Sequence, residues 1–354
     1  MIKVGIIGTG GMADAHARAY RAIKGCKIVA ACDIDSKKVS TFAREHEIDR
    51  VYTNVETLLS DGDCDAFSIV TPDPTHHPLT MQALSANMHV LCEKPLGLNF
   101  EQTVEMQRAA EKAGVIHMVN FSYRNSSAIQ KATELVAQGE LGNIRHVHAN
   151  YLQSWLVHDY WGDWRKTPAW LWRLSRDRGS AGVINDIGIH IIDFASMPLG
   201  SLASVHCRLK CFEKEEGPEV DGYTLDANDS AIITAEFTNG ALGTIHTTRW
   251  AYPHENSLQL FLYGNKASIE IDLNASYSTL KINRILGRQA MGWEELDCGI
   301  TPTIHERFIQ SINTGVQGQP DFARGSEVQH VLDACHESAN TDRTIRIHDD
   351  KPTN

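Results

Sequence analysis

Residues 2–13, IKVGIIGTGGMA, decide the fold of the first third of the chain. An apolar run rich in β-formers ends in GTGGMA, the pattern G-x-G-x-x-A. In this pattern Gly8 permits a tight turn, Gly10 lets the backbone approach a pyrophosphate, and the small Ala13 lets the following helix pack on the strand. That helix, at about residues 12–24, offers N–H groups and the positive end of its dipole to phosphates. The stretch therefore predicts a dinucleotide-binding turn made of Gly8, Gly10, Gly11 and Met12.

A carboxylate follows the next strand. Residues 27–32 form a second apolar run that ends at Asp33, 25 residues after Gly8. A carboxylate at this point can accept hydrogen bonds from the ribose hydroxyls of adenosine, and it would repel a 2′-phosphate. Asp33 therefore favours NAD over NADP, although Lys37 and Lys38 nearby leave NADP open. The simpler alternative is a solvated carboxylate at a strand end.

Strand and helix patterns then alternate up to residue 122. Prolines in TPDPTHH, residues 71–77, forbid both strand and helix, so this segment is a rigid loop at the carboxyl end of a strand. Such alternation is typical of a doubly wound parallel sheet. The predicted elements are strands at 51–52, 66–70, 89–92 and 115–120, with helices at 36–47, 54–60, 77–86 and 99–113, the last capped by Asn99.

The strand at 89–92 stops abruptly at Glu93-Lys94-Pro95. Lys94 precedes a proline, so its backbone is pushed towards an extended conformation, and a cis Lys94-Pro95 bond is open. Ligands bind at the carboxyl ends of strands in an open α/β sheet, where the Lys94 ammonium would be held. An isolated tripeptide of this kind is more often a strand end with a surface lysine. The dinucleotide turn upstream favours a functional lysine here.

The second part of the chain changes to period-two strands, with a strong hairpin turn at Asn239-Gly240. Adjacent strands of this kind predict an α+β domain, residues 123–354, with a large, mainly antiparallel open sheet. Its exposed face is a natural surface for a homo-oligomer, a dimer or tetramer. The predicted strands are 144–152, 203–211, 230–238, 241–250, 257–263, 267–273 and 343–347, and the predicted helices are 127–138, 303–313 and 326–340.

One helix, at residues 183–194, interrupts these strands and carries ionisable groups in an apolar segment. Asp186 and His190 stand at i and i+4, so they are neighbours on one helical face. The pair fits a catalytic role as well as it fits a core histidine tied to a carboxylate. Asp193, three residues after His190, reads as a supporting or capping residue.

Composition limits the class of protein. A length of 354 residues predicts two domains at about 150 residues each. The net charge of −11 argues against nucleic acid or an anionic membrane as the main partner. No apolar run approaches the roughly 18 residues of a membrane span, and no signal peptide is expected. Eight scattered cysteines without a C-x-x-C pattern, and His146 and His148 without a second ligand pair, predict no disulfides and no metal site in a cytoplasmic protein.

Taken together, these residues resemble the glucose–fructose oxidoreductase/inositol dehydrogenase (Gfo/Idh/MocA) family. The resemblance spans residues 1 to about 200, and the strand-rich remainder fits the second domain of that family. Asp73, where asparagine is common, and Ser180-Ala181-Gly182, where a glycine triplet is usual, depart from the pattern. The residues that carry the resemblance are GTGGM at 8–12, Thr71-Pro72 with His76, Glu93-Lys94-Pro95, Tyr123-Arg124, Trp172-Arg173 and the segment from Asp186 to Asp193.

The resemblance implies a Rossmann domain over residues 1–122 and an NAD(P)-dependent dehydrogenase. It places the nicotinamide near Lys94, with the substrate between it and the Asp186/His190 pair. Lys94 would hydrogen-bond the reacting hydroxyl, His190 would act as general base, and Asp186 would orient it or bind an adjacent hydroxyl. The cofactor-binding residues implied beyond the glycine turn and Asp33 are Thr71, Pro72, His76, Glu93 and Lys94.

Residues 151–173 give the substrate prediction. They hold five of the seven tryptophans, whose faces suit the C–H faces of a pyranose or cyclitol. Tyr123, Gln153, Trp155 and Arg173 join Asp186 and His190 as predicted substrate residues. Two alternatives stay open: a tryptophan-rich packing loop, and arginines (165, 173, 176 and 178) that hold a carboxylate or phosphate.

The predicted reaction is oxidation of a secondary hydroxyl of a sugar, sugar derivative or inositol by hydride transfer to NAD. One rival is an NADPH-linked reductase of a keto-sugar, against which Asp33 argues. The other is a non-catalytic protein of the same fold that senses a dinucleotide or sugar. The presence of Lys94, Asp186 and His190 together argues against a mere binder.

Overall fold

The chain divides into two compact units in the computed structural model, which describes residues 1–347. The first unit holds Met1–Ser122 and Pro302–Gln329, and the second holds Tyr123–Thr301 and residues 330–347. The division after residue 122 falls where the sequence places it. Residues 302–329 were assigned to the second domain from the sequence, but the structure groups them with the first unit.

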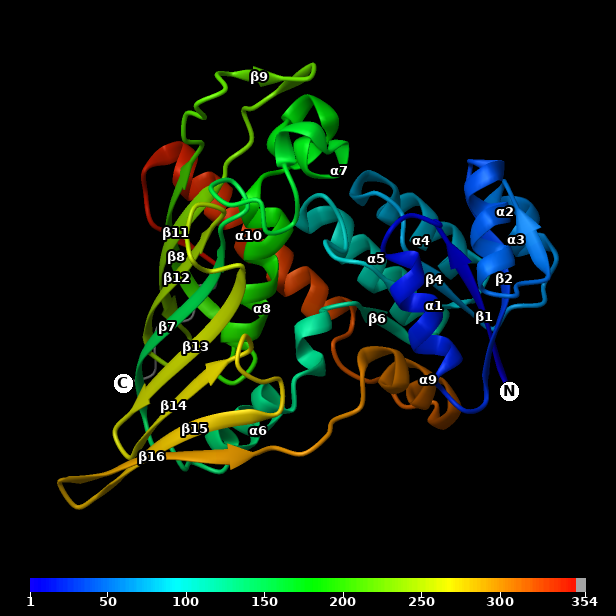
Figure 1. The fold of residues 1–354 in the computed structure, drawn as a ribbon. Coiled ribbons are helices and arrows are strands. Elements are labelled where there is room, and N and C mark those ends of the chain that lie inside the picture. Colours follow the sequence, from blue (N-terminus) through cyan, green and yellow to red (C-terminus); the bar gives the residue numbers. More distant parts are fainter. Residues whose placement is uncertain (348–354) are drawn as a thin grey trace. The chain divides into compact units, whose positions relative to one another are not determined.

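The first unit is built on a six-stranded parallel sheet in the order β3-β2-β1-β4-β5-β6 (Figure 1). This is the strand order of the dinucleotide-binding Rossmann fold, so the predicted fold class of this part is confirmed. The strands are β1 (Ile2–Ile7), β2 (Cys26–Cys32), β3 (Arg50–Tyr52), β4 (Ala66–Ile69), β5 (His89–Cys92) and β6 (His117–Val119).

The helices of this unit lie close to their predicted places. α1 buries His16, Ala17 and Tyr20 together with Ala13, one stripe at helical spacing. The side chain of Asn99 accepts a hydrogen bond from the backbone N–H of Gln102 at 2.9 Å, which confirms the predicted cap of α5. The helices are α1 (Ala13–Arg21), α2 (Ser36–Glu45), α3 (Val55–Ser60), α4 (His76–Ser85), α5 (Phe100–Ala113) and α9 (Ile304–Thr314).

Ring contacts explain why residues 302–329 belong to the first unit. The His305 ring lies edge-on to the rings of His16 and Tyr20, with centroids 4.6 and 4.9 Å apart. Phe322 packs on His117 with ring centroids 4.9 Å apart. These partners are about 200 or more positions away in the sequence, so no local pattern could reveal them.

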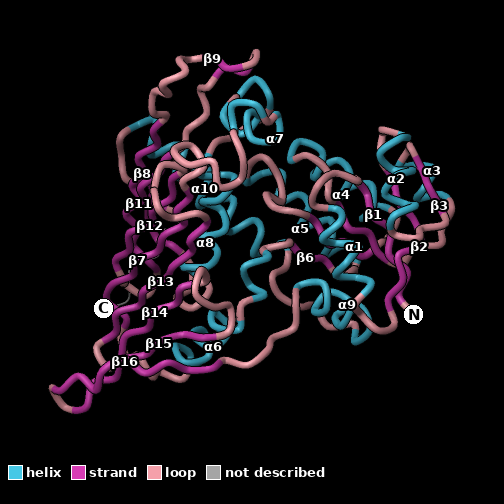
Figure 2. The backbone as a smooth tube through the Cα atoms, in the orientation of Figure 1, coloured by secondary structure: helices cyan, strands magenta, loops and turns pink. Residues whose placement is uncertain are grey.

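The second unit is built on a nine-stranded sheet in the order β16-β15-β14-β13-β7-β12-β11-β8-β17 (Figure 2). Of the pairs described in it, β7 with β12 is parallel and the others are antiparallel, so the predicted mainly antiparallel sheet is confirmed. The strands are β7 (Ile144–Gln153), β8 (Leu202–Lys210), β11 (Ser230–Phe237), β12 (Leu242–Thr248), β13 (Asn256–Gly264), β14 (Ala267–Asp272), β15 (Thr279–Leu286), β16 (Gln289–Asp297) and β17 (Ile345–Arg346).

The hairpin of β15 and β16 was not predicted. Nearly every side chain of β16 is exposed, so the strand lacks the alternation of buried and exposed positions that marks a half-buried strand. A separate two-stranded sheet pairs β9 (Glu219–Val220) with β10 (Tyr223–Thr224).

Helices cover one face of the nine-stranded sheet, as Figure 2 shows for α6 and α8. The opposite face presents Ile232, Leu242 and Tyr263, which are about half exposed. The helices are α6 (Ser127–Ala137), α7 (Pro168–Leu171), α8 (Ile189–Ser196) and α10 (Phe322–Thr341), which starts in the first unit. Short 3-10 turns lie at Asp73–Thr75, Ser122–Asn125, Trp164–Lys166, Trp172–Leu174 and Arg176–Arg178.

No helix within the described part of the chain has both the length and the apolar composition needed to cross a bilayer. Among residues 1–347, no three side chains of His, Cys, Asp or Glu converge as metal ligands do. All eight cysteines are free thiols.

Candidate active site

The glycine turn has room where a pyrophosphate would need it. Gly8 has φ +92°, and a Cβ atom there would lie 2.5 Å from the carbonyl oxygen of Val70, so this position requires glycine. A Cβ atom at Gly10 or Gly11 would meet nothing within 4 Å. Met12 precedes α1 without making a side-chain hydrogen bond to its first turn. The start of α1 is therefore open to a phosphate, and these residues fit a dinucleotide.

Asp33 is tied to the same turn. Its Oδ2 atom accepts hydrogen bonds from the backbone N–H and the hydroxyl of Thr9 at 2.8 and 2.9 Å, and its Oδ1 atom accepts one from the N–H of Asp35 at 2.9 Å. Burial works against the charge, but these bonds outweigh it and lower the pKa of Asp33. A charged acceptor is thus fixed beside the glycine turn.

A buried polar network supports the residue before Lys94. The Oε1 atom of Glu93 lies 2.8 Å from Nε2 of His16 and accepts a hydrogen bond from the amide of Asn120 at 2.6 Å. The other ring nitrogen of His16 lies 2.8 Å from the hydroxyl of Ser68. Burial opposes the charge of Glu93, yet His16, Asn120 and the charge of Lys94 hold its pKa at about 2. Glu93 is therefore an ionised carboxylate inside the first unit.

This network predicts a pH-dependent stability. Because the folded pKa of Glu93 lies below its ordinary 4.5, the stabilisation is present at neutral pH and is lost as the pH falls from about 4.5 towards 2. The shift corresponds to at most about 3 kcal/mol. Glu93→Gln should therefore lower the free energy of unfolding, measured in urea, most strongly at pH 7. The difference in this free energy between the variant and wild type should become smaller near pH 3. Glu45→Gln, at an exposed position, is the control. If the difference in unfolding free energy between Glu93→Gln and wild type does not change with pH, Glu93 is not the ionised carboxylate described here.

Lys94 stands at the end of β5, and its bond to Pro95 is cis. Its backbone N–H donates to the Oε2 atom of Glu93 at 3.1 Å. His76 is fully buried, with ring nitrogens 2.6 Å from the carbonyl oxygen of Pro95 and 2.8 Å from that of Thr71. His76 therefore joins the loop after β4, which holds Thr71 and Pro72, to the Lys94 segment. Contacts of these residues with a cofactor stay a prediction.

In the second unit, Asp186 lies in a π-helical segment, η6 (Ile184–Gly188), that runs into α8. Such segments are frequent at functional sites. Gly182, just before it, has φ +86°, and a Cβ atom there would overlap the side chain of Asn228 at 2.1 Å. The last glycine of the family triplet is thus required here by close packing.

His190 follows on α8 and is buried among tyrosines. The ring of Tyr123 lies edge-on to the His190 ring, with centroids 5.0 Å apart, and the hydroxyls of Tyr123 and Tyr151 are hydrogen-bonded. Burial raises the pKa of Tyr151 well above its ordinary value, so its phenol stays protonated. The structure thus brings together His190 and Tyr123, two of the predicted residues.

Asp193 has the supporting role expected of it. Its carboxylate is bound by the guanidinium of Arg124 in a bidentate pair, with distances of 2.7 and 2.6 Å, and both side chains are buried. Bidentate pairs of this kind are among the stronger hydrogen bonds. The pair ties α8 to the segment that carries Tyr123.

The tryptophan segment is largely core. Trp155 and Trp164 are 3% and 2% exposed and belong to a buried cluster with leucines, against which Trp161 and Trp170 pack. The indole N–H of Trp155 donates to the side-chain oxygen of Gln153 at 3.0 Å. These contacts favour the packing alternative for most of the segment. The substrate roles of Gln153 and Trp155 stay predictions.

Arg173 is the arginine of this segment that reaches the site. Its Nε atom lies 3.3 Å from Oδ2 of Asp186, and its guanidinium lies over the rings of Trp170 and Trp172. Arg165 is instead bound to acidic neighbours, Asp163 and Glu216.

Comparison with known proteins identifies the family. Residues 2–121 match the oxidoreductase family with an NAD-binding Rossmann fold, and residues 129–270 match the GFO/IDH/MocA C-terminal domain. The chain belongs to the Gfo/Idh/MocA oxidoreductase family. It is therefore an oxidoreductase with an NAD-binding domain.

Members of this family with similar chains include two named enzymes. Levoglucosan dehydrogenase of Pseudarthrobacter phenanthrenivorans is 25% identical, with 98% of each chain covered. D-glucoside 3-dehydrogenase of Escherichia coli is 27% identical over 98% of this chain and 97% of the relative. Among solved structures, an oxidoreductase domain protein from Kribbella flavida is 30% identical with a TM-score of 0.88, covering 98% of this chain and 99% of that one.

Three residues of this Gfo/Idh/MocA chain that contact predicted site residues escaped the sequence reasoning: His16 and Asn120 in the first unit, and Arg249 in the second. His16 had a signal, since a polar side chain on the buried stripe of α1 needs a partner. Asn120 directly follows β6, and no local pattern marks it. Arg249 donates to Asp186 at 2.8 Å across 63 positions of sequence, which no spacing rule covers.

Proposed function

We propose that this chain is an NAD-preferring dehydrogenase that oxidises a secondary hydroxyl of a sugar, sugar derivative or inositol. The names of two full-length relatives support this substrate class, because levoglucosan and a D-glucoside are both carbohydrates. Carbon 3 of a glucoside carries a secondary alcohol, which matches the type of group proposed.

The observation that carries the proposal is the grouping of His190, Tyr123 and Asp186 in the second unit. Tyr123 lies edge-on to the His190 ring, and Asp186 stands four residues before His190 on the same helical segment. A base beside a phenol and a carboxylate suits a substrate that presents several hydroxyls. A protein that only senses a sugar has no need of a base there.

The proposed roles follow from the path of the hydroxyl proton during the reaction. Loss of hydride from carbon requires that the hydroxyl proton leaves, and His190 accepts it, since histidine titrates near neutral pH. Lys94 hydrogen-bonds the reacting oxygen, and Asp186 accepts a hydrogen bond from an adjacent hydroxyl. The NAD nicotinamide, when bound, supplies the hydride acceptor. Gly8, Gly10, Gly11 and Met12 would hold its pyrophosphate and Asp33 its ribose.

The test is NAD reduction over a panel of sugars, anhydrosugars, inositols and sugar acids, repeated with NADP. Turnover of a polyol with NAD supports the proposal. Reduction of keto-sugars by NADPH alone would favour the reductase alternative. NAD binding without any turnover over the panel would favour a sensing protein.

The preference for NAD gives a specific prediction. Asp33→Ala should lower the ratio of kcat/KM with NAD to that with NADP by about tenfold or more, because a charged acceptor for the ribose is lost and repulsion of a 2′-phosphate is removed. Asp49→Ala, an exposed carboxylate of the same unit, is the control. An unaltered cofactor ratio in Asp33→Ala would remove Asp33 from ribose recognition.

We also propose that the exposed face of the nine-stranded sheet joins copies of this chain into a dimer or tetramer. That face exposes the apolar side chains of Ile232, Leu242 and Tyr263 to solvent. Contact with another copy of the chain would remove them from water. Light scattering of the purified protein measures the oligomeric state, and Leu242→Glu should shift it towards monomer.

A further inference from the structure

We infer that Arg249 is a positioning residue that holds Asp186 as a charged hydrogen-bond acceptor for a substrate hydroxyl. The inference rests on the proposed function of Asp186 and adds a residue that no spacing in the sequence reveals. Arg249 follows the last residue of β12 and lies 63 positions after Asp186.

Three contacts fix the guanidinium of Arg249. One terminal nitrogen donates to Oδ2 of Asp186 at 2.8 Å, and the other donates to the backbone carbonyl oxygen of Arg173 at 3.0 Å. The guanidinium carbon lies 5.0 Å from the ring centroid of Trp155. The side chain is completely buried, so it has no freedom to leave this arrangement.

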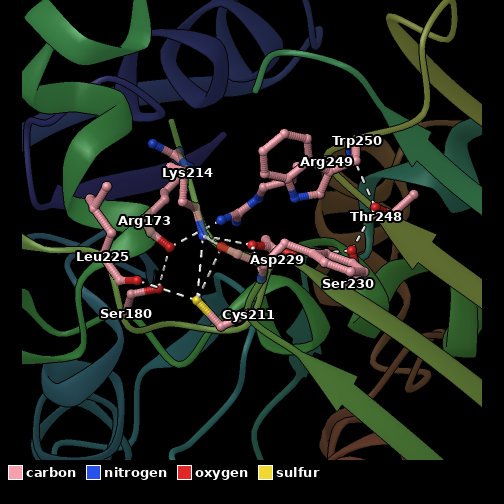
Figure 3. Close-up of polar contacts among 11 residues, drawn as sticks. Arg173, Ser180, Cys211, Lys214, Leu225, Asp229, Ser230, Thr248, Arg249 and Trp250 are labelled. Atoms are coloured by element: carbon pink, nitrogen blue, oxygen red, sulfur yellow. Dashed lines mark hydrogen bonds and ion pairs between the residues drawn. The ribbon is translucent and has the colours of Figure 1, made fainter. Parts of the chain in front are cut away.

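The carbonyl of Arg173 is an anchor shared by two donors. Figure 3 shows Arg249 and Ser180 reaching this carbonyl, and the Ser180 hydroxyl donates to it at 2.6 Å. Ser180 is one of the departures from the family glycine triplet, so in this chain the departure adds a bond to the same anchor. The main chain that carries Arg173 is thereby fixed against Arg249.

Asp229, the other carboxylate described near Arg249, already forms an ion pair with Lys214. Asp229 accepts a hydrogen bond from the ammonium of Lys214 at 2.6 Å, a contact drawn in Figure 3, and both side chains are buried. Arg249 therefore uses Asp186 as its directly bonded counter-charge. Burial lowers the pKa of Arg249, and the charge of Asp186 acts in the opposite direction.

The coupling works both ways, so the Arg249 charge favours the ionised form of Asp186. The groups that face Asp186 include Arg249, Arg173 and Tyr151, while His190 and Asp193 lie on its own helical segment. Asp193 is taken by Arg124. Asp186 keeps a quarter of its side-chain surface exposed, so part of this side chain can be reached from solvent. Held this way, Asp186 accepts hydrogen bonds and leaves the hydroxyl proton to His190.

Arg173 does not replace Arg249 in this role. Its Nε atom lies 3.3 Å from Asp186, and its side chain is 27% exposed, so its charge is screened more strongly by water. Arg249 and Arg173 thus contribute unequally to holding Asp186, and the buried Arg249 sets the orientation of the Asp186 carboxylate.

Arg249→Ala tests the inference by chemical rescue. The variant should lower kcat on the substrate found in the panel by about a hundredfold, with little change in the Kd for NAD, because misplacement of one group costs about that much. Millimolar guanidinium should recover at least tenfold of the lost rate, whereas urea, a neutral molecule of the same shape, should recover none. The acid limb of the pH–rate profile, where the rate falls as the pH is lowered, should lie at higher pH in Arg249→Ala than in wild type. Added guanidinium should move this limb back to its wild-type position.

Arg249→Lys keeps a cation and serves if the alanine variant does not fold, as judged by circular dichroism. It should keep the acid limb of wild type while losing part of kcat, because an ammonium cannot bond Asp186 and the Arg173 carbonyl in the same fork. Arg208→Ala, an exposed arginine of β8 paired with Asp342, is the matched control for loss of an arginine. It should show neither rate loss nor rescue.

The outcomes separate this inference from the proposed function. If Asp186→Asn loses turnover while Arg249→Ala keeps it, or if urea rescues as well as guanidinium does, the positioning role is overturned and the proposed function stands. If Asp186→Asn keeps full turnover, the proposed role of Asp186 fails and the inference fails with it. A lysine variant whose acid limb moves as far as that of Arg249→Ala also overturns it.

Discussion

Lys94→Ala should reduce kcat by about a thousandfold or more while NAD still binds. In the proposed mechanism the Lys94 ammonium hydrogen-bonds the reacting oxygen, so its loss acts on the chemical step. The residues that would hold the pyrophosphate and ribose lie at the glycine turn and at Asp33, and the substitution leaves them intact. The backbone bond from Lys94 to the buried Glu93 carboxylate also survives, so the end of β5 should keep its conformation.

Stopped-flow reduction of NAD gives the chemical step of this variant, and calorimetric titration gives its Kd for NAD. Lys112→Ala, at the exposed end of α5, is the control for loss of a lysine in the same unit. Loss of NAD binding in Lys94→Ala, with the chemical step preserved at saturating NAD, would place Lys94 on the dinucleotide and not at the reacting hydroxyl. Lys94→Arg should not restore the rate, because a planar guanidinium is a poor substitute for a compact ammonium.

His190→Asn should lower kcat by about a hundredfold at neutral pH, with a smaller loss as the pH rises. The imidazole accepts the hydroxyl proton in the proposed mechanism, and solvent hydroxide takes over part of that task at alkaline pH. Asparagine keeps a polar side chain beside the edge of Tyr123, so the buried site should stay packed. The variant therefore separates proton acceptance from structure.

The measurement is kcat and kcat/KM over the full pH range in which the protein is stable. His158→Asn, an exposed histidine of the second unit, is the control and should keep the wild-type profile. A pH profile of His190→Asn with the shape of wild type would remove His190 as the base, whatever the size of the rate loss. Activity would then have to be explained by Lys94 alone.

Local patterns were enough to predict the Rossmann sheet. The glycine turn, the alternation of strands and helices, and the cap at Asn99 all depend on residues a few positions apart. For the same reason Asp186 and His190 could be placed on one helical segment. The π-helical segment Ile184–Gly188 has no signal in the local pattern, and the N–H of Ile184 donates to the side-chain oxygen of Asn228, 44 positions away.

Contacts between distant residues set the limit of the prediction. His16 meets Glu93 and Asn120 across 77 and 104 positions, and Arg249 meets Asp186 across 63. The tryptophan segment shows a different limit, since aromatic composition does not distinguish a sugar platform from a packed cluster. The exposed strand β16 had no buried face to reveal it.

The return of residues 302–329 to the first unit has a consequence for the order of synthesis. The ring of His305 packs on His16 and Tyr20, so the N-terminal 122 residues lack part of their own core when they leave the ribosome. At about 5–20 residues per second, roughly ten to forty seconds pass before the missing segment is made. A nascent chain therefore carries an incomplete nucleotide-binding unit while β7 to β16 of the large sheet are translated, and only β17 follows the missing segment. For the same reason, a transplantable version of that unit needs both stretches of the chain, joined by a new linker.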